Sequence, residues 1–355
     1  MTLQISNQGY NIEVGHLIES SLQKVLTENY SNAKKIILVD ENIQKYCLDY
    51  LLTQFDLSEA EIVTVPAGEE SKTIDICVQI WEALSSYDIN RNDLMINLGG
   101  GMITDLGGFI ASTYKRGIDF INIPTSLLGM VDASIGGKTG IDLNNYKNQI
   151  GVFSNPKLVI CDSVFLKTLP EEEFLSGKAE MLKHSLINSE KHWNIVKDLT
   201  PKSISDEYIA ASIQVKNDLV LKDPKEKNDR KKLNLGHTIG HALEMYLLTR
   251  KKQPHGYCVA WGIVTEAYLS FLEKNIKEDT YKEIYKVVSS LYPKPDISKK
   301  EDIKNIIDLM KNDKKNNSSE INFNLLKGFG NIEVDYHFAY NEIHTALKDI
   351  FATND

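Results

Sequence analysis

The sequence predicts an α/β domain of the nucleotide-binding type with a parallel-type sheet, followed by an all-helical domain, with a cleft between them. Three observations indicate this fold class. Short apolar strands alternate with helical stretches up to about residue 168, three glycines at 99–101 directly follow one strand, and long helical patterns succeed one another after residue 169. Alternating strands and helices are typical of a parallel sheet covered on both faces. We therefore expect a Rossmann-like domain over 1–168 and a mainly helical domain over 169–355.

The strands of the first domain are short apolar runs. Residues 1–15 predict a hairpin or edge strands. Continuous apolar runs of this length are typical of strands buried in a parallel sheet, and they occur at 35–40, 61–65, 93–98, 118–123 and 157–161. Helical patterns lie between them at 74–87 and 102–114, where Gly107 and Gly108 would permit close packing.

The second domain is dominated by helical periodicity. Helices are expected at 171–189, 206–222, 231–246, 259–272, 279–291, 300–311 and 340–351. Only 320–326 and 331–334 look like strands, and we expect them to form a small hairpin. The polar stretch 311–319 is predicted to be a mobile loop.

Composition narrows the class of protein. The apolar content of 42% and charged content of 25% are ordinary for a soluble globular protein. A net charge of −9 argues against nucleic-acid or anionic-membrane partners, so an anionic small substrate would need a local basic cluster. The four cysteines form no ligand or disulfide pattern, the N-terminus does not resemble a signal peptide, and no stretch approaches a membrane span. A cytoplasmic enzyme is the expectation.

Three histidines suggest a metal centre. His237 and His241 lie four residues apart in a helical pattern, so both imidazoles project from one face. His255 follows a loop and stands at the entry of the next helix. Histidines from two helices leave room for a carboxylate and an open position, as in catalytic zinc sites. Glu180 is the candidate carboxylate, with Lys183 on the same helix face. The alternatives are surface or core histidines and a surface ion pair.

The triple glycine and Asp40 suggest a bound phosphate and ribose. Gly99-Gly100-Gly101 joins a strand to a helix, so bare backbone and a helix N-terminus could face an anion. Asp40 ends an earlier strand and could accept hydrogen bonds from ribose hydroxyls. The alternatives are an ordinary tight turn and a helix N-cap.

The segment 125–151 is predicted to be irregular and functional, because it holds five glycines and little periodicity. Lys138 lies in a Gly-Gly-Lys-Thr-Gly run, but a P-loop requires glycine at position 132, which is aspartate, so we reject an ATPase. Farther on, Lys216, Arg230 and Asn234 would line one cleft with the histidines, although each alone is more typical of a solvated side chain.

Assembled in order, these motifs resemble the 3-dehydroquinate synthase family, a branch of the sugar-phosphate cyclases. The resemblance spans nearly the whole chain through PAGEESK, GGGMITDLGGF, YKRG, PTSLLGMVDASIGGKTG, YKNQIG, FLKTLP, GKAEMLKH, LNLGHTIGHALE, HG and a late DKK. It implies that zinc, or cobalt, is held by Glu180, His237 and His255. It implies NAD contacts from Asp40, Glu69, Lys72, Gly100, Gly101, Asp105, Thr125, Ser126, Lys138, Lys147 and Thr168.

The same resemblance implies how the substrate is recognised. The residues implied are Arg116, Asp132, Lys138, Lys147, Asn148, Lys183, Lys216, Arg230, Asn234, His241 and Lys314, the last favoured over Lys315. His241, near the metal but outside the ligand set, suits proton relay. Three positions depart from the family pattern. Tyr257 stands where an acidic residue is usual, Asn228-Asp229 replaces glycine and an apolar residue before Arg230, and Ser126 replaces a common threonine.

The implied reaction converts 3-deoxy-D-arabino-heptulosonate 7-phosphate to 3-dehydroquinate and phosphate, in the shikimate pathway of aromatic amino-acid biosynthesis. It would proceed by transient NAD oxidation, phosphate elimination, re-reduction and intramolecular aldol closure, in a homodimeric lyase. Three rivals are another sugar-phosphate cyclase, a metal- and NAD-dependent alcohol dehydrogenase of similar fold, and a non-catalytic NAD-binding sensor. The dehydrogenase would not need so many phosphate-binding cations, and the sensor would not need Glu180, Lys183 and three histidines together.

Overall fold

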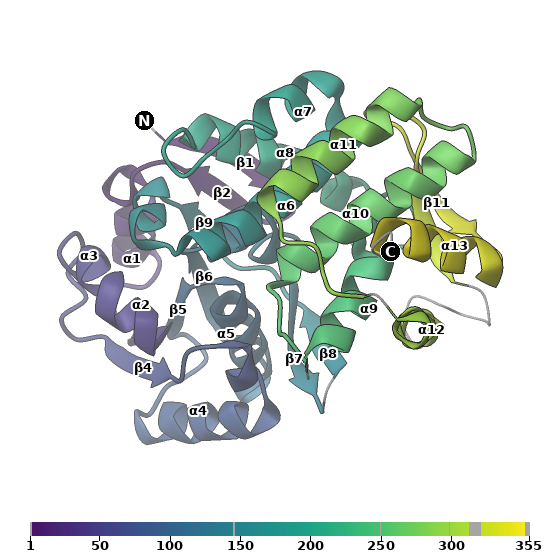
Figure 1. Ribbon diagram of the computed structural model, residues 1–355. Helices are drawn as coiled ribbons and strands as arrows, with labels where there is room; N and C mark the ends of the chain where they lie inside the picture. The colour runs from purple at the N-terminus through teal and green to yellow at the C-terminus, as the bar shows by residue number, and fades with distance from the viewer. Residues whose placement is uncertain (1, 145, 249, 298, 312–320, 352–355) are drawn as a thin grey trace. The chain divides into compact units, whose positions relative to one another are not determined.

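The chain forms two compact units. The computed structural model describes residues 2–144, 146–248, 250–297, 299–311 and 321–351 (Figure 1). The first unit comprises Met1–Phe174 with Thr200–Leu221, and the second comprises Leu175–Leu199 with Lys222–Asp355. The first unit therefore continues past the predicted boundary at residue 168 and includes the helical stretch 206–221, which the sequence predicts for the second domain.

A seven-stranded sheet forms the centre of the first unit. Its strands are β1 (Leu3–Asn7), β2 (Tyr10–Val14), β3 (Lys35–Asp40), β4 (Glu61–Val65), β5 (Leu94–Gly99), β6 (Asp119–Pro124) and β9 (Leu158–Cys161). They are arranged in the order β1-β2-β9-β6-β5-β3-β4, and all neighbours are parallel except the β1–β2 hairpin. The predicted strands and parallel-type sheet are confirmed. The central strand β5 is buried throughout, which explains its continuous apolar run.

The first unit also contains helices, of which α2, α4 and α5 contact this sheet. They are α1 (Leu22–Glu28), α2 (Glu41–Tyr46), α3 (Leu48–Leu52), α4 (Ile74–Ser86), α5 (Gly101–Thr113) and α8 (Asp206–Lys222). Helix α5 lies against β5 and β6 and contacts α4 (Figure 1). A Cβ atom on Gly107 would lie 2.0 Å from Asn97 Oδ1 and one on Gly108 would lie 2.4 Å from Thr139 Cγ2, so both glycines permit close packing as predicted.

The segment 125–151 is more regular than the sequence indicated. A π-helical turn spans Gly129–Ala133, and an antiparallel hairpin follows, with β7 (Lys138–Leu143) pairing with β8 (Tyr146–Phe153). The expectation of an irregular segment is therefore wrong for its second half. Gly140 and Gly151 are partners across this hairpin, and a Cβ on Gly140 would lie 2.7 Å from Ile150 O. Glycine at these positions hides the period-two alternation that predicts a strand.

The second unit is helical apart from one hairpin. Its helices are α6 (Glu171–Asn188, which begins in the first unit), α7 (Glu190–Val196), α9 (His237–Leu247), α10 (His255–Leu272), α11 (Glu278–Leu291), α12 (Lys300–Lys311) and α13 (Tyr340–Phe351). The predicted strand pair is confirmed as β10 (Asn322–Leu326) and β11 (Ile332–His337), which are antiparallel. The predicted mobile loop falls almost entirely on 312–320, outside the described residues.

The predicted helix at 231–246 is divided in two. A 3-10 helix spans Asp229–Asn234, and α9 begins only at His237. Between them Gly236 has φ +78°, in the left-handed region that glycine adopts without steric cost. The helical periodicity of the sequence ran across this break, and a lone glycine within a helical pattern does not reveal it.

Helices α9 and α10 pack backbone to backbone. A Cβ on Gly240 would lie 3.0 Å from Val259 Cα, and one on Gly262 would lie 2.0 Å from Gly236 O. Helix α10 also contacts α11 and α13. The spacing of the two histidine-bearing helices is therefore set by their main chains.

The four cysteines are buried free thiols. Among the described helices, none is both long enough and apolar enough to cross a membrane.

Candidate active site

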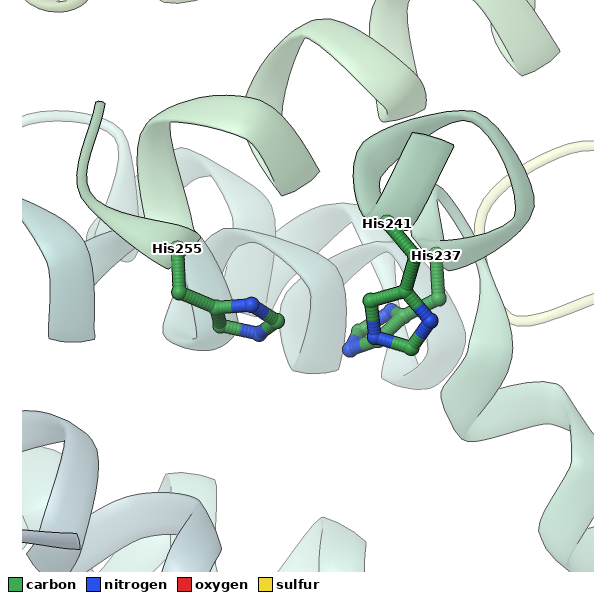
Figure 2. Close-up of side chains that lie close together, drawn as sticks. All are labelled: His237, His241 and His255. Atoms are coloured by element: carbon green, nitrogen blue, oxygen red, sulfur yellow. The ribbon is translucent and has the colours of Figure 1, made fainter. Parts of the chain in front are cut away.

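Three imidazoles face one another in the second unit. His237 opens α9 and His241 follows one turn later, while His255 is the first residue of α10 (Figure 2). Ring centroids are 5.2 Å apart for His237 and His241, 5.6 Å for His237 and His255, and 5.7 Å for His241 and His255. One nitrogen from each ring lies within 4.8 Å of the others. The three imidazoles therefore converge on one point in the second unit.

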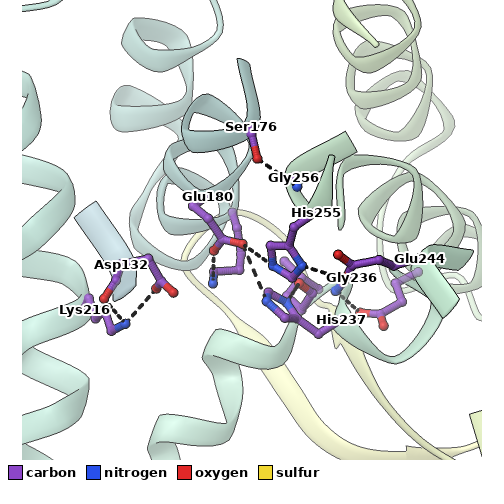
Figure 3. A network of polar contacts seen from close by, with 12 residues as sticks. Asp132, Ser176, Glu180, Lys216, Gly236, His237, Glu244, His255 and Gly256 are labelled. Atoms are coloured by element: carbon purple, nitrogen blue, oxygen red, sulfur yellow. Dashed lines mark hydrogen bonds and ion pairs between the residues drawn. The ribbon is translucent and has the colours of Figure 1, made fainter. Parts of the chain in front are cut away.

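Glu180 brings a carboxylate to two of these rings. It lies in α6 with no exposed side-chain surface, and its Oε1 is 3.5 Å from His237 Nε2 and 3.6 Å from His255 Nε2 (Figure 3). Four ligands at about 2.1 Å from a tetrahedral zinc lie about 3.4 Å from one another. The donor set of two imidazoles and one carboxylate oxygen therefore fits such an ion.

Lys183 forms an ion pair with Glu180 from three residues farther along α6. The two side chains are 1% and 0% exposed, so the alternative of a surface ion pair is wrong. Helix α6 is held close to the start of α10, because Ser176 Oγ accepts a hydrogen bond of 3.1 Å from Gly256 N–H. A Cβ on Gly256 would lie 2.1 Å from Ser176 O, so this approach requires glycine beside His255.

The two imidazoles that face Glu180, those of His237 and His255, each have a second partner at Nδ1. His237 Nδ1 lies 3.2 Å from Leu235 O, and His255 Nδ1 lies 3.0 Å from Glu244 Oε2. Burial lowers the pKa of His255, but the carboxylates of Glu244 and Glu180 outweigh burial and raise this pKa to about 9. The field at this position therefore favours a cation.

The predicted nucleotide elements gather at one edge of the sheet in the first unit. Strand β3 has β4 on one side and β5 on the other, so the chain reverses its direction of winding between β3 and β5. Ligands of open α/β sheets bind at such switch points, beyond the carboxyl ends of the strands. Asp40 ends β3, Gly99 ends β5, and Thr125 and Ser126 follow β6.

The local contacts at this edge are built by backbone and short side chains. Helix α5 begins at Gly101, with Gly100 as its N-cap, and Thr125 N–H donates to Gly99 O over 2.9 Å. A Cβ on Gly100 would lie 3.3 Å from Ser126 Oγ. Asp40 caps α2 by accepting from Ile43 N–H over 2.9 Å, so the N-cap alternative is observed. A carboxylate in this role keeps a second oxygen for a ligand.

A buried lysine organises a polar cluster beside these elements. Lys72 is 2% exposed, and its Nζ donates to Asp105 Oδ2 over 2.7 Å and to Asn148 Oδ1 over 2.6 Å. Burial lowers the pKa of Lys72, but Asp105 and Glu69 outweigh it and raise this pKa, so the ammonium stays charged. Lys147 Nζ lies 3.9 Å from Glu69 Oε1. Five of the predicted residues, Glu69, Lys72, Asp105, Lys147 and Asn148, are thus brought together.

The remaining predicted residues occupy varied environments. Lys216 Nζ contacts Asp132 Oδ1 at 2.8 Å (Figure 3), and Lys138 and Arg116 are exposed, the latter with φ +68°. Arg230 is 2% exposed and donates to Pro224 O over 2.7 Å, so it is not the solvated charge that its position alone suggested. Thr168 ends a 3-10 helix, and Lys314 and Lys315 lie outside the described residues.

Sequence reasoning missed the carboxylates that hold the predicted residues. Glu226 Oε1 accepts from Asn234 Nδ2 over 2.7 Å, Asp223 accepts from Arg230 N–H, and Glu266 Oε2 accepts from Gly236 N–H over 2.7 Å. Glu244 could have been found, because it lies seven residues after His237 on the same helix face. The others carried no spacing signal.

Comparisons with known proteins cover nearly the whole chain. Two family models match in sequence order: 3-dehydroquinate synthase N-terminal over residues 62–176 and 3-dehydroquinate synthase C-terminal over residues 177–316. The 3-dehydroquinate synthase of Parabacteroides distasonis is 39% identical over 335 residues, which covers 93% of this chain and 94% of the relative. The chain belongs to the 3-dehydroquinate synthase family. A second relative of that name, from Pelagibacter ubique, is 38% identical over 358 residues and covers 98% of this chain and 97% of its own.

Solved structures show that this 3-dehydroquinate synthase family member has the sugar-phosphate cyclase fold. A 2-deoxy-scyllo-inosose synthase complexed with carbaglucose-6-phosphate, NAD+ and Co2+ matches with TM-score 0.84 and 22% identity over 98% of this chain and all of its own. ValA, a 2-epi-5-epi-valiolone synthase from Streptomyces hygroscopicus with NAD+ and Zn2+ bound, matches with TM-score 0.86 and 21% identity over 98% of each chain. An iron-containing alcohol dehydrogenase reaches 0.67 at 17% identity, over 98% of this chain and 99% of its own.

Tyr257, which departs from the family pattern, packs against another aromatic ring. Its side chain is buried, and its ring meets that of Tyr292 edge-on, with centroids 5.1 Å apart. Tyr292 in turn donates to Leu175 O over 3.0 Å. Tyr257 is therefore a packing residue between α10 and the segment after α11. Ser126 keeps a hydroxyl that accepts from Gly129 N–H over 3.1 Å.

Proposed function

We propose that this chain converts 3-deoxy-D-arabino-heptulosonate 7-phosphate to 3-dehydroquinate and inorganic phosphate. The reaction is that of a phosphate-eliminating lyase. A secondary alcohol of the substrate is oxidised to a ketone by NAD, and the ketone acidifies the neighbouring C–H. Loss of this proton eliminates phosphate, and the hydride held by NAD then reduces the ketone again. Ring opening and an intramolecular aldol closure complete the product. One observation carries the proposal: in a chain of this family, His237 and His255 converge on the buried carboxylate of Glu180.

Glu180, His237 and His255 would hold one Zn2+ or Co2+ ion. Glu180 Oε1 lies 3.5 Å from His237 Nε2 and 3.6 Å from His255 Nε2, close to the separation of ligands on such an ion, and Lys183 balances part of the buried negative charge. When bound, the ion would lower the pKa of the substrate hydroxyl and stabilise the alkoxide. Lys183 would hold a substrate oxygen beside the centre through a charge-assisted hydrogen bond.

NAD would occupy the switch point of the sheet. The triple-glycine turn offers N–H groups to the pyrophosphate, and Asp40 offers a carboxylate oxygen to the ribose. When bound, NAD would accept the hydride and return it within one turnover. The contacts we assign to NAD are those of Asp40, Glu69, Lys72, Gly100, Gly101, Asp105, Thr125, Ser126, Lys138, Lys147 and Thr168.

Cationic and amide side chains would bind the substrate. The chain as a whole carries a net charge of −9, which repels a substrate with a dianionic phosphate and a carboxylate. Binding therefore needs several local charge-assisted hydrogen bonds. His241, half-buried beside the ligand pair, would hydrogen-bond the substrate and relay a proton. The substrate contacts we assign are those of Arg116, Asp132, Lys138, Lys147, Asn148, Lys183, Lys216, Arg230, Asn234, His241 and Lys314.

The direct test supplies the heptulosonate phosphate with excess Zn2+ and an amount of NAD+ far below the substrate concentration. We expect phosphate release to continue for many turnovers per NAD+, with no rise in NADH absorbance. One NADH formed for each product would identify a dehydrogenase instead. Phosphate release from a hexose 6-phosphate, with none from the heptulosonate, would identify another sugar-phosphate cyclase.

We further infer a homodimer in the cytoplasm. The inference of a dimer is supported by the resemblance to the family, and the compartment by four buried thiols without a disulfide. Light scattering on the purified chain measures the assembly directly. A mass of 40.1 kDa at micromolar concentration would contradict the dimer.

A further inference from the structure

We propose that Glu244 is a positioning residue of the metal centre, which holds the His255 ring so that its Nε2 faces the ion. The inference rests on the proposed metal site of Glu180, His237 and His255. Glu244 lies in α9, three residues after His241, and its side chain is 10% exposed. Its Oε2 is 3.0 Å from His255 Nδ1, a hydrogen-bond distance.

The two nitrogens of His255 are addressed from opposite sides. Glu244 meets Nδ1, while Nε2 lies 3.6 Å from Glu180 Oε1, so the ring stands between two carboxylates (Figure 3). A proton on Nδ1, donated to Glu244, leaves the Nε2 lone pair directed toward the ligand cluster. A carboxylate behind a ligating imidazole fixes its tautomer and increases its donor strength.

The two ligand histidines are held differently. His237 Nδ1 faces the neutral carbonyl oxygen of Leu235, two residues away in its own segment. His255 has a charged partner that belongs to the neighbouring helix. The bond between Glu244 and His255 therefore ties α9 to α10 beside the centre, and it makes His255 the stronger electron donor of the pair.

The position of His255 explains why it needs this support. It is the first residue of α10, and Pro254 before it provides no side-chain cap. The backbone contact between Gly240 and Val259 sets the helix spacing but does not itself orient the ring of His255. The residue after Gly256, where the family resemblance implied an acid, is the packing residue Tyr257. Among the residues that the structure describes, the carboxylates within ion-pair distance of His255 are those of Glu180 and Glu244.

The test measures Co2+ and Zn2+ affinity of the full chain by competition with a chromophoric chelator, together with the visible spectrum of the Co2+ form. Glu244→Ala should weaken binding about 10- to 100-fold and change the Co2+ spectrum. Glu244→Gln keeps the size and the hydrogen-bond acceptor but removes the charge, so its loss should be smaller. Glu273→Gln is the matched control, because Glu273 follows the last residue of α10 at the exposed surface and accepts from Tyr336 Oη over 2.9 Å.

The outcomes separate this inference from the metal site itself. If the unchanged chain binds no metal, or His237→Ala binds it normally, the proposed site is wrong. If the unchanged chain binds metal and Glu244→Ala keeps both affinity and spectrum, only the positioning role is wrong. Should Glu244→Ala fail to fold, Glu244→Gln decides: unchanged affinity and spectrum in a folded Gln variant would overturn the proposal. Equal weakening in Glu273→Gln would likewise reduce it to a nonspecific charge effect.

Discussion

At the scale of single residues, one helical turn separates two histidines to which we assign different roles. His237 is buried with its Nε2 3.5 Å from Glu180 Oε1, whereas His241 is half-buried, and its ring centroid lies 5.2 Å from that of His237. The carboxylate of Glu180 can therefore complete the proposed ligand set without His241. The three-histidine group is the geometric rival, because nitrogens of all three rings lie within 4.8 Å of one another.

Substitution of single histidines distinguishes the ligand set of Glu180, His237 and His255 from a set of the three histidines. His237→Ala should abolish stoichiometric zinc binding after dialysis. His241→Ala should keep zinc and melting temperature but lower turnover about a hundredfold or more, as expected for a lost general acid–base group. Metal analysis, thermal unfolding and phosphate release are measured on the same preparations. Loss of zinc from His241→Ala would make His241 a ligand and contradict the set of Glu180, His237 and His255.

A second prediction at this scale concerns acid stability. Burial, and then the neighbouring His184, lower the pKa of His192 to about 4 from an ordinary 6.5. The unfolded chain therefore binds this proton at higher pH than the folded chain. The contribution of neutral His192 to the free energy of unfolding is present above pH 6.5 and is lost as pH falls toward 4. At pH 5 the loss would be about 2 kcal/mol.

His192→Gln should remove much of this pH dependence, because glutamine does not titrate and can still meet Asn188, whose Nδ2 lies 3.2 Å from His192 Nδ1. Urea unfolding of the metal-free His192→Gln variant and of the unchanged protein, at pH 7.5 and at pH 5, measures this pH dependence. Parallel losses of unfolding free energy in both proteins would assign the acid sensitivity to other groups.

At the scale of elements, Gly236 determines where α9 begins and hence where His237 points. Its φ is +78°, and a Cβ there would lie 2.5 Å from Ile263 Cγ1 and 2.8 Å from Val259 O. Gly236→Ala should therefore lower the free energy of unfolding by at least about 2 kcal/mol, from left-handed strain and overpacking together, and should weaken zinc binding.

Gly328→Ala is the control for the strain alone. Gly328 has φ +108° and no atom within 4 Å of a Cβ position. It should cost about 1–2 kcal/mol and leave zinc affinity unchanged. Chemical denaturation and chelator competition test both variants. Normal zinc affinity in Gly236→Ala would show that the start of α9 does not position His237.

Most elements could be predicted because their patterns are long or fully buried. The strands at 35–40 and 61–65 and the helices at 206–222, 300–311 and 340–351 are confirmed to the residue, and the strands at 93–98, 118–123 and 157–161 shift by at most one position. Helices α1, α2 and α3 are five to seven residues long, too short to show a period of 3.6. The break at Gly236 and the hairpin β7–β8 depend on backbone geometry that glycine permits, but the presence of a glycine in the sequence does not predict that geometry.

The site could be predicted where spacing carries information. The i, i+4 histidines and the i, i+3 pair of Glu180 and Lys183 follow from helical geometry. Supporting groups such as Glu226 and Glu266 contact backbone or amide atoms of other segments, and no local pattern encodes those contacts. The roles assigned to Lys314 and to the NAD-contacting residues stay predictions.

At the scale of the whole molecule, the two proposed cofactors belong to different compact units. Glu180, His237 and His255 all lie in the second unit, whereas Asp40 and the glycines at 99–101 lie in the first. A ligand stabilises the elements whose folded form it binds. In hydrogen exchange, NAD+ should slow amides after β3 and at the start of α5, and Zn2+ should slow those of α6, α9 and the start of α10.

Mass spectrometry of exchanged peptides measures this division, with chelated, NAD-free protein as the reference. Protection by NAD+ confined to α9 and α10, with none near Asp40, would contradict the assignment of the nucleotide to the sheet edge.

The buried thiols make this chain convenient for site-specific labelling. Thiolate is the form that attacks a maleimide, and burial raises the pKa of Cys47 to about 11 and that of Cys77 to about 12. Cys161 and Cys258 are equally hidden from solvent. A cysteine introduced at the exposed Ser290 of α11 would therefore outcompete all four natural thiols for a dye or spin label. Spectroscopic probes can thus be attached without first constructing a cysteine-free background.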